Sequence, residues 1–202
     1  MAEYAATGNR LDLIRSAAID HFSRKGYHGA NLREIAADAG IQAGSMYYHY
    51  ESKEHLLFDA LWVSMERLIR EVNGAVTWSA PPSVRLEQAV RQHVLCHAEH
   101  QAEARVLHND MDVLTGTYRQ RMAERRDEYE RIFSRILLDG VTSGEFRPLD
   151  VKLAVFAIIA IGQGVSRWYR PDGRLTAREI AEYYAQMVVR AAQAGAPVAV
   201  GA

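Results

Sequence analysis

Apolar residues recur at intervals of three and four along most of the 202-residue chain, and this periodicity constrains the fold more than any other feature. It is clear in Leu11–Phe22 near the beginning and in Ile180–Val188 near the end. No segment alternates apolar and polar residues with the β-branched enrichment of a strand. The sequence therefore predicts an all-α fold of about nine helices.

Short polar side chains precede several of these segments, where they can accept hydrogen bonds from the free N–H groups of a first helical turn. Asn31 and Thr176 are each followed three residues later by a glutamate, which is the capping-box spacing. Gly40 and Gly140 are predicted to end helices. The remaining predicted caps are Asn9, Ser52, Ser83 and Asp150.

The charge balance disfavours proteins that hold nucleic acid by bulk charge, because 24 Lys and Arg stand against 25 Asp and Glu. The single cysteine, Cys96, excludes an intrachain disulfide and a cysteine-rich zinc site. Met1–Arg10 lacks the features of a signal peptide, and the uncharged apolar stretch Leu153–Ser166 falls short of the roughly 18 to 20 residues that span a bilayer. We expect a cytoplasmic protein.

The two short segments on either side of Gly40 have the arrangement of a helix-turn-helix. Ala36 and Ala39 are small enough for close helix approach, and Gly40 suits the left-handed backbone of the turn. In this motif the first helix braces the second, whose side chains enter the DNA major groove, about 12 Å wide. The segment is therefore a candidate DNA-binding element.

The continuation Gly40–Leu57 closely resembles the signature of the TetR family of transcriptional repressors. In that signature a Gly, an apolar residue, Tyr, a variable residue, His and an aromatic residue precede Ser-Lys-Glu and Leu. The resemblance covers about Leu11–Leu61, with Asn31 and Tyr50 at positions where the family usually has Thr and Phe.

The resemblance implies two sets of DNA contacts. The phosphate-contacting set is Asn31, Tyr47, His49 and Lys53. The groove-facing set is Gln42, Ala43, Ser45 and Tyr48, with Gly44 allowing close backbone approach and Arg33 completing the predicted contacts. The residue types agree with this division, because hydroxyl, amide and ammonium groups bind phosphates while amides and hydroxyls read base edges.

Tyr50 is expected to pack inside the small domain, whereas Tyr47 and Tyr48 are expected at DNA because a short helix cannot bury all three rings. Residues 1–56 contain six basic and seven acidic residues, so bulk charge cannot hold this domain on DNA. Binding must depend on a few specific contacts, and a dimer would make each of them twice. We predict a DNA-binding domain over residues 1–52, an effector-binding and dimerisation bundle over residues 53–193, and a flexible tail over residues 194–202.

The segment Val151–Val165 is apolar on nearly every side, so it needs both a core face and a partner subunit to cover it. The alternative is a helix buried wholly within one subunit. The resemblance implies dimerisation through the last two helices. The predicted interface residues are Phe156, Ile159, Gln163, Tyr184, Met187 and Val188.

A repressor of this kind needs an effector that binds its two states unequally. The segments Gly144–Pro148 and Ser166–Thr176 resemble family members that respond to acyl-CoA thioesters and control fatty-acid or steroid catabolism. Arginines there could meet CoA phosphates, although exposed arginines in an ordinary loop are the alternative. The candidate effector residues are Val94, Met111, Leu114, Phe133, Phe156, Arg167, Trp168 and Arg170.

Other functions were weighed against this hypothesis. His93, His97 and His100 share one helical face and could bind zinc or nickel in a metal-sensing repressor, but no stronger metal motif accompanies them. An aromatic, drug-like effector is also open. The chain has no Gly-rich phosphate loop on a strand and no nucleophile elbow, so we expect neither an enzyme nor a cofactor. A protein-scaffolding module is the remaining class. The favoured hypothesis is a homodimeric, ligand-responsive repressor of a palindromic operator.

Overall fold

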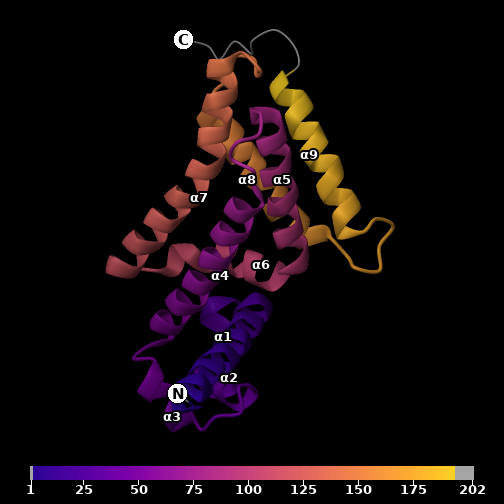
Figure 1. Cartoon of the computed structure of the whole chain (residues 1–202). Helices are drawn as coiled ribbons and strands as arrows, with labels where there is room; N and C mark the ends of the chain where they lie inside the picture. Colours follow the sequence, from indigo (N-terminus) through magenta and orange to yellow (C-terminus); the bar gives the residue numbers. More distant parts are fainter. Residues whose placement is uncertain (1, 194–202) are drawn as a thin grey trace. The chain divides into compact units, whose positions relative to one another are not determined.

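The computed structural model describes residues 2–193, with side chains from residue 10 onward. Within these residues it contains no strand, and Figure 1 shows the helices in chain order. The all-α prediction is confirmed, and the predicted tail lies outside the described residues. The elements are α1 (Ala2–Gly29), α2 (Leu32–Asp38), α3 (Ala43–His49), α4 (Lys53–Ala75), α5 (Pro82–Glu99), α6 (Gln101–Asp110), the short 3-10 helix η1 (Met111–Val113), α7 (Gly116–Ser143), α8 (Val151–Trp168) and α9 (Ala177–Gln193).

The chain forms two compact units. Unit 1 comprises the described residues up to 66 together with residues 102–124, and unit 2 comprises residues 67–101 and the described residues from 125 onward. Unit 1 thus extends past the predicted boundary after residue 52. The Glu54 carboxylate accepts hydrogen bonds from both the backbone N–H and the hydroxyl of Thr115, and the Tyr118 ring stacks on Phe58 at 4.5 Å. These contacts attach η1 and the start of α7 to α4.

The core of unit 1 forms where α1, α2 and α4 bury one apolar face each. Ile14, Phe22, Ile35 and Leu57 are at most 1% exposed. The helix α1 bends at Gly26, whose φ of 68° lies in the left-handed region, and Gly40 ends the α2 turn with a φ of 71°. This packing fixes α2 against α1 and leaves one side of α3 uncovered.

Side-chain caps account for the starts of α2, α4, α8 and α9. Asn31 Oδ1 accepts from Arg33 N at 2.8 Å, Ser52 Oγ from His55 N at 3.0 Å, and Asp150 Oδ1 from Leu153 N at 3.0 Å. The capping box at Thr176 forms in both directions with Glu179.

Four local predictions are wrong. Glu34 does not complete a capping box, because its carboxylate pairs with Lys25 Nζ at 2.6 Å. Helix α1 begins at Ala2, so Asn9 does not cap it, and α5 begins at Pro82 rather than after Ser83. Gly140 does not end α7. It lies inside that helix, where the Phe146 ring packs so closely that a Cβ at residue 140 would lie 2.7 Å from Phe146 Cγ.

Unit 2 is built on α5, which packs against both α8 and α9 (Figure 1). The α5 residues Leu86, Val90, His93 and Val94 are completely buried. The approach of α8 depends on Gly162, since a Cβ there would lie 2.7 Å from His93 Cε1 and 2.9 Å from His97 Cγ. Gly162 therefore permits close contact between α8 and α5 of the same chain.

Candidate DNA-binding and effector sites

The helix α3 presents a polar, aromatic face that the rest of unit 1 does not cover. Met46 is completely buried and fixes the helix to the core. Tyr47 is 58% exposed and Tyr48 is 87% exposed, so both rings lie at the surface rather than in the core. An aromatic side chain held this far out of a two-turn helix is available to an external partner.

Gln42 is the N-cap of α3, yet its side chain makes no capping hydrogen bond. Both Gln42 and Gly44 are exposed, while Ala43 and Ser45 are half-buried. The Gln42 amide therefore keeps its donor and acceptor groups free at the N-terminal end of the helix. An amide in this state can pair with adenine, which offers one acceptor and one donor in the major groove.

Asn31 and Arg33 lie at the start of α2, and both are exposed. The oxygen of the Asn31 side chain caps α2, which leaves its amide nitrogen as the group able to donate to a phosphate. His49 is half-buried and its ring packs edge-on against Tyr48.

Lys53 makes contacts that sequence analysis did not anticipate. Its Nζ donates to the carbonyl oxygens of Tyr27 at 2.7 Å and Ala30 at 3.0 Å, with His28 O at 3.3 Å, and it lies 4.5 Å from the centre of the Tyr27 ring. An ammonium group has three N–H donors, so these carbonyls occupy all of them. Lys53 thus caps the C-terminal end of α1, and a phosphate contact would compete with these bonds.

Tyr50 packs inside unit 1, as expected. It is 2% exposed, and its hydroxyl donates to Asp59 Oδ2 at 2.7 Å. Asp59 in turn accepts from Arg15 Nε at 2.8 Å. Burial and the neighbouring carboxylate raise the pKa of Tyr50 well above its ordinary value.

The basic residues of the described part of unit 1 are largely committed to partners within the unit. Arg15 pairs with Asp12 and Asp59, Arg24 with Asp20, and Lys25 with Glu34. The Lys25 ammonium lowers the pKa of Glu34 through a hydrogen bond. Because these basic side chains are paired with carboxylates, the described part of the unit has no diffuse positive surface, in line with the expectation that a few specific contacts would hold DNA.

The candidate effector residues fall into both units. Met111 and Leu114 belong to unit 1, and the other six belong to unit 2. Val94 and Phe133 are completely buried in the core of unit 2, whereas Phe156 is 44% exposed on α8. The exposure of Phe156 favours its predicted place at a subunit interface over a place in a pocket.

The loop between α8 and α9 forms a cavity of about 250 Å³ that contains two of the candidates, Trp168 and Arg170. Arg174, one of the arginines that the sequence hypothesis places near CoA phosphates, lines it too, together with Leu175. Arg170 makes no ion pair or hydrogen bond through its side chain within the described residues. The cavity therefore combines an indole, an apolar wall and guanidinium groups, which is a surface suited to a phosphate-bearing ligand.

The histidine face of α5 has a structural role. Both ring nitrogens of His93 are hydrogen-bonded, one to the Tyr129 hydroxyl and the other to Ile158 O at 3.1 Å. His97 is 7% exposed, and His100 lies half-buried just after the end of α5. No group of three or more His, Cys, Asp or Glu side chains in the described chain has the arrangement of a metal site. The geometry gives no support to the metal-sensing alternative.

Two family models match the chain. The model of bacterial regulatory proteins of the tetR family matches residues 14–60, and that of the tetracyclin repressor-like C-terminal domain matches residues 79–192. The second match alone spans more than half of the sequence. The chain belongs to the TetR family.

Individual relatives agree with this assignment. The HTH-type transcriptional repressor KstR2 of Mycobacterium tuberculosis H37Rv is 32% identical over 183 residues, which cover 89% of this chain and 90% of the relative. A solved tetR-family regulatory protein from Rhodococcus RHA1 is 31% identical with a TM-score of 0.86, covering 93% of this chain and 98% of that one. AibR, solved with isovaleryl coenzyme A and operator DNA, is 27% identical with a TM-score of 0.82, covering 88% and 97%.

This TetR-family protein carries an unpartnered apolar face on α8 and α9. Leu153, Phe156 and Met187 are between 41% and 54% exposed, and Ile159, Gln163, Tyr184 and Val188 are half-buried. Only 28% of α8 is buried, so the helix is not enclosed within its own subunit. By length and composition alone α8 could cross a membrane, but dimerisation, which is typical of the family, gives such a face another cover.

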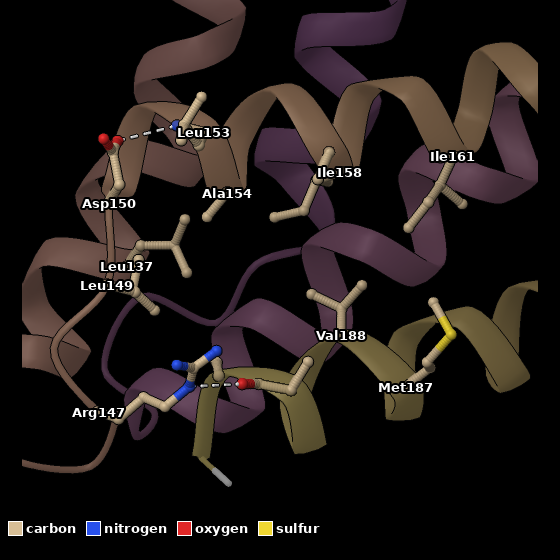
Figure 2. Close-up of a pocket in the computed structure, with 13 residues that line it drawn as sticks. Leu137, Arg147, Leu149, Asp150, Leu153, Ala154, Ile158, Ile161, Met187 and Val188 are labelled. Carbon is tan, nitrogen blue, oxygen red and sulfur yellow. Dashed lines mark hydrogen bonds between the residues drawn. The ribbon is translucent and has the colours of Figure 1, made fainter. Parts of the chain in front are cut away.

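A second cavity, of about 350 Å³, opens beside this face, and sequence analysis did not foresee it. Its walls are almost entirely apolar. Figure 2 shows Ile158 of α8 facing Val188 of α9, and Arg147 at one end donating from Nε to Ala191 O at 3.1 Å. No sequence pattern indicates this cavity, because its residues come from three separate stretches of the chain: residue 137, residues 147–161 and residues 187–192.

Proposed function

We propose that this protein is a homodimeric transcriptional repressor that binds a palindromic operator and is released by a small effector. The observation that carries this proposal is the state of α3, whose Gln42, Tyr47 and Tyr48 side chains are exposed although Met46 anchors the helix in the core. Tyr47 and His49 contact phosphates, while Gln42, Ser45 and Tyr48 face base edges. Asn31 and Arg33 add contacts from the start of α2.

The operator can be identified by repeated selection from random double-stranded DNA, followed by footprinting of the enriched sequence. We expect two inverted half-sites whose centres are one helical turn, or a multiple of it, apart. The Gln42→Ala protein should lose about 1–3 kcal/mol of binding free energy and its preference at one position of each half-site. Val63→Ala is the matched control, because Val63 is exposed on α4 and lies outside the predicted contacts. Failure to enrich any sequence at physiological salt would refute operator binding.

The effector we propose is an acyl-CoA thioester bound in unit 2, with its phosphates at Arg170 and Arg174 and its adenine or pantetheine group against Trp168. The cavity in the α8–α9 loop supports this assignment. So does the similarity to AibR, whose solved complex contains isovaleryl coenzyme A. An apolar acyl chain would extend toward the apolar side chains of the bundle, among which are Val94 and Phe133.

Calorimetry with coenzyme A, isovaleryl-CoA and octanoyl-CoA tests this assignment directly. We expect binding of at least one thioester and release of the protein from operator DNA at the same concentration. The Arg170→Ala/Arg174→Ala protein should bind the thioester at least tenfold more weakly, the cost of losing charge-assisted contacts to phosphate. Arg178→Ala is the control for the loss of a positive charge outside the cavity, since Arg178 is exposed on α9 and does not line the cavity. Release of DNA by a compound without CoA, together with no thioester binding, would refute the assignment.

The dimer forms, in this proposal, through the exposed apolar face of α8 and α9 and the adjoining 350 Å³ cavity. The isologous arrangement places Phe156 and Met187 in contact with the same helices of the partner. A Phe156→Asp protein should sediment as a monomer at micromolar concentration and lose operator affinity. If the wild-type protein sediments as a monomer under those conditions, the proposed dimer is refuted. As a DNA-binding regulator the protein would act in the cytoplasm and catalyse no reaction.

A further inference from the structure

The junction between α1 and α2 is held by a lysine that lies far from it in the sequence. Lys53, the first residue of α4, donates from Nζ to Tyr27 O at 2.7 Å, to Ala30 O at 3.0 Å and to His28 O at 3.3 Å. The last turn of a helix leaves its carbonyls without N–H donors, and the helix dipole favours a cation there. One ammonium group therefore supplies the donors for three carbonyls of this junction.

These bonds reach the start of α2 through a single peptide unit. The Ala30 carbonyl and the Asn31 N–H belong to one planar peptide, so a fixed Ala30 O also fixes the direction in which Asn31 begins. Ala30 is 4% exposed, and its own N–H donates to Gly26 O at 3.1 Å. Asn31 Oδ1 then accepts from Arg33 N at 2.8 Å. The orientation of the Ala30 carbonyl thus decides where Asn31 and Arg33, both exposed, lie.

Two further contacts hold the same junction. Tyr27 N donates to Oδ1 of Asp110, a residue of α6 that is 7% exposed, and both residues belong to unit 1. The Tyr27 ring stacks on Phe22 of the core at 6.0 Å and lies 4.5 Å from Lys53 Nζ. The junction is therefore braced from α4 and from α6, and Lys53 is the cationic member of this brace.

A phosphate contact at Lys53 would displace these bonds. An ammonium group has three N–H donors, and the three carbonyls use them. Lys53 is also half-buried, whereas Arg33 is exposed at the start of α2. The two roles differ in salt dependence, because a lysine that meets a phosphate releases counterions from DNA and a lysine bonded to carbonyls does not.

We propose that Lys53 is a positioning residue for operator binding: it holds the peptide between Ala30 and Asn31, and with it the start of α2, in the orientation that DNA requires, and it contacts no phosphate itself. Because α2 packs against α3, the same brace also orders the groove-facing helix. Without the ammonium group the junction would have to become ordered on binding, which weakens affinity without removing a contact from the complex. This inference rests on the proposed operator binding and names a residue that prepares the protein for it.

Two substitutions separate the brace from the charge. Lys53→Met keeps the apolar stem and removes the ammonium group, whereas Lys53→Arg keeps the charge but has a planar fork that cannot bring three donors to one point. At a temperature where unfolding curves show each variant fully folded, we expect both to bind the selected operator roughly tenfold more weakly, with the wild-type slope of log affinity against log salt. Arg33→Met is the matched control for charge. It should reduce the slope by about 1.8, because a dimer would lose two phosphate contacts.

Wild-type protein labelled with ¹⁵N-lysine gives a readout that does not depend on how the variants fold, and the sequence has only three lysines. The Nζ resonance of Lys53 should show no coupling to DNA phosphorus when the operator is added. Such a coupling, or wild-type affinity of Lys53→Arg, would assign Lys53 to a phosphate and overturn the inference. If both folded Lys53 variants bind as tightly as the wild type, the lysine serves stability alone, and the inference is overturned while operator binding stands. If the wild type selects no operator, both are overturned.

Discussion

A single added methyl group should test the packing of α8 on α5. Gly162→Ala would place a Cβ 2.7 Å from His93 Cε1, closer still to His93 Nε2, and 2.9 Å from His97 Cγ. His93 Nε2 donates to Ile158 O, the carbonyl that an α-helix assigns to the N–H of residue 162. The imidazole can reach this carbonyl only because residue 162 lacks a side chain.

The magnitude follows from three contributions. Forcing a methyl into a filled core costs about 1–3 kcal/mol. Breaking the buried bond between His93 and Ile158 costs about 1–3 kcal/mol more, because its donor finds no substitute. Alanine offsets roughly 1 kcal/mol of this through its higher helix propensity. The net loss is about 3 kcal/mol, which for a domain of this size lowers Tm by roughly 6–12 °C.

Thermal and urea unfolding at equal protein concentration measure this loss, since the stability of a dimer depends on concentration. Gly164→Ala is the matched control two residues away. A Cβ there has Trp168 Nε1 as its nearest neighbour, at an ordinary 3.9 Å, so the variant should equal or exceed the wild type in stability. Equal stability of Gly162→Ala and Gly164→Ala would contradict both the close approach of α8 to α5 at Gly162 and the contribution of the hydrogen bond between His93 and Ile158.

Three further predictions concern charged and titratable groups. Lys53→Met should lower the free energy of unfolding by about 1–2 kcal/mol, because the carbonyls of Tyr27, His28 and Ala30 lose their donor; unchanged stability would leave the phosphate contact as the main role of Lys53. Tyr50→Phe should cost about 1 kcal/mol in urea unfolding, through the lost bond to Asp59, and a neutral result would contradict that bond's contribution. The pKa of His97 falls from 6.5 to about 4 on folding, so between these values the unfolded chain binds more protons and stability should decrease by about 3 kcal/mol as pH falls. His97→Asn should flatten this slope, and an equally steep profile would assign it to other groups.

Much of the local structure could be predicted because it depends on neighbouring residues. Asn31, Asp150 and Thr176 cap helices through bonds to N–H groups two or three residues away, and such bonds need no distant partner. The pattern fails where a distant group intervenes. Glu34 pairs with Lys25 instead of completing the capping box, and Gly140 lies within a helix, where the Phe146 ring occupies the space that a side chain at residue 140 would need.

The candidate DNA-binding site was largely predictable, because α2 and α3 lie within about 20 residues and their exposed side follows from helical periodicity. Tyr47 and Tyr48 are exposed and Tyr50 is buried, as the sequence indicated. The hydrogen bonds from Lys53 to the backbone carbonyls of Tyr27 and Ala30 could not be predicted from the sequence, because these residues precede Lys53 by more than 20 positions.

The sequence by itself determined that the chain is helical, that a short helix pair near its N-terminus has the features of a DNA-binding motif, and that α8 is too apolar to stand alone. These properties depend on composition and on spacings within a few turns. Only the tertiary structure decided that His93 and His97 of α5 take part in hydrogen bonds with Tyr129 and backbone carbonyls, and that Arg170 and Arg174 line one cavity. Hydrogen-bond partners and cavities are made by segments far apart in sequence, so the arrangement of the helices in space must fix them.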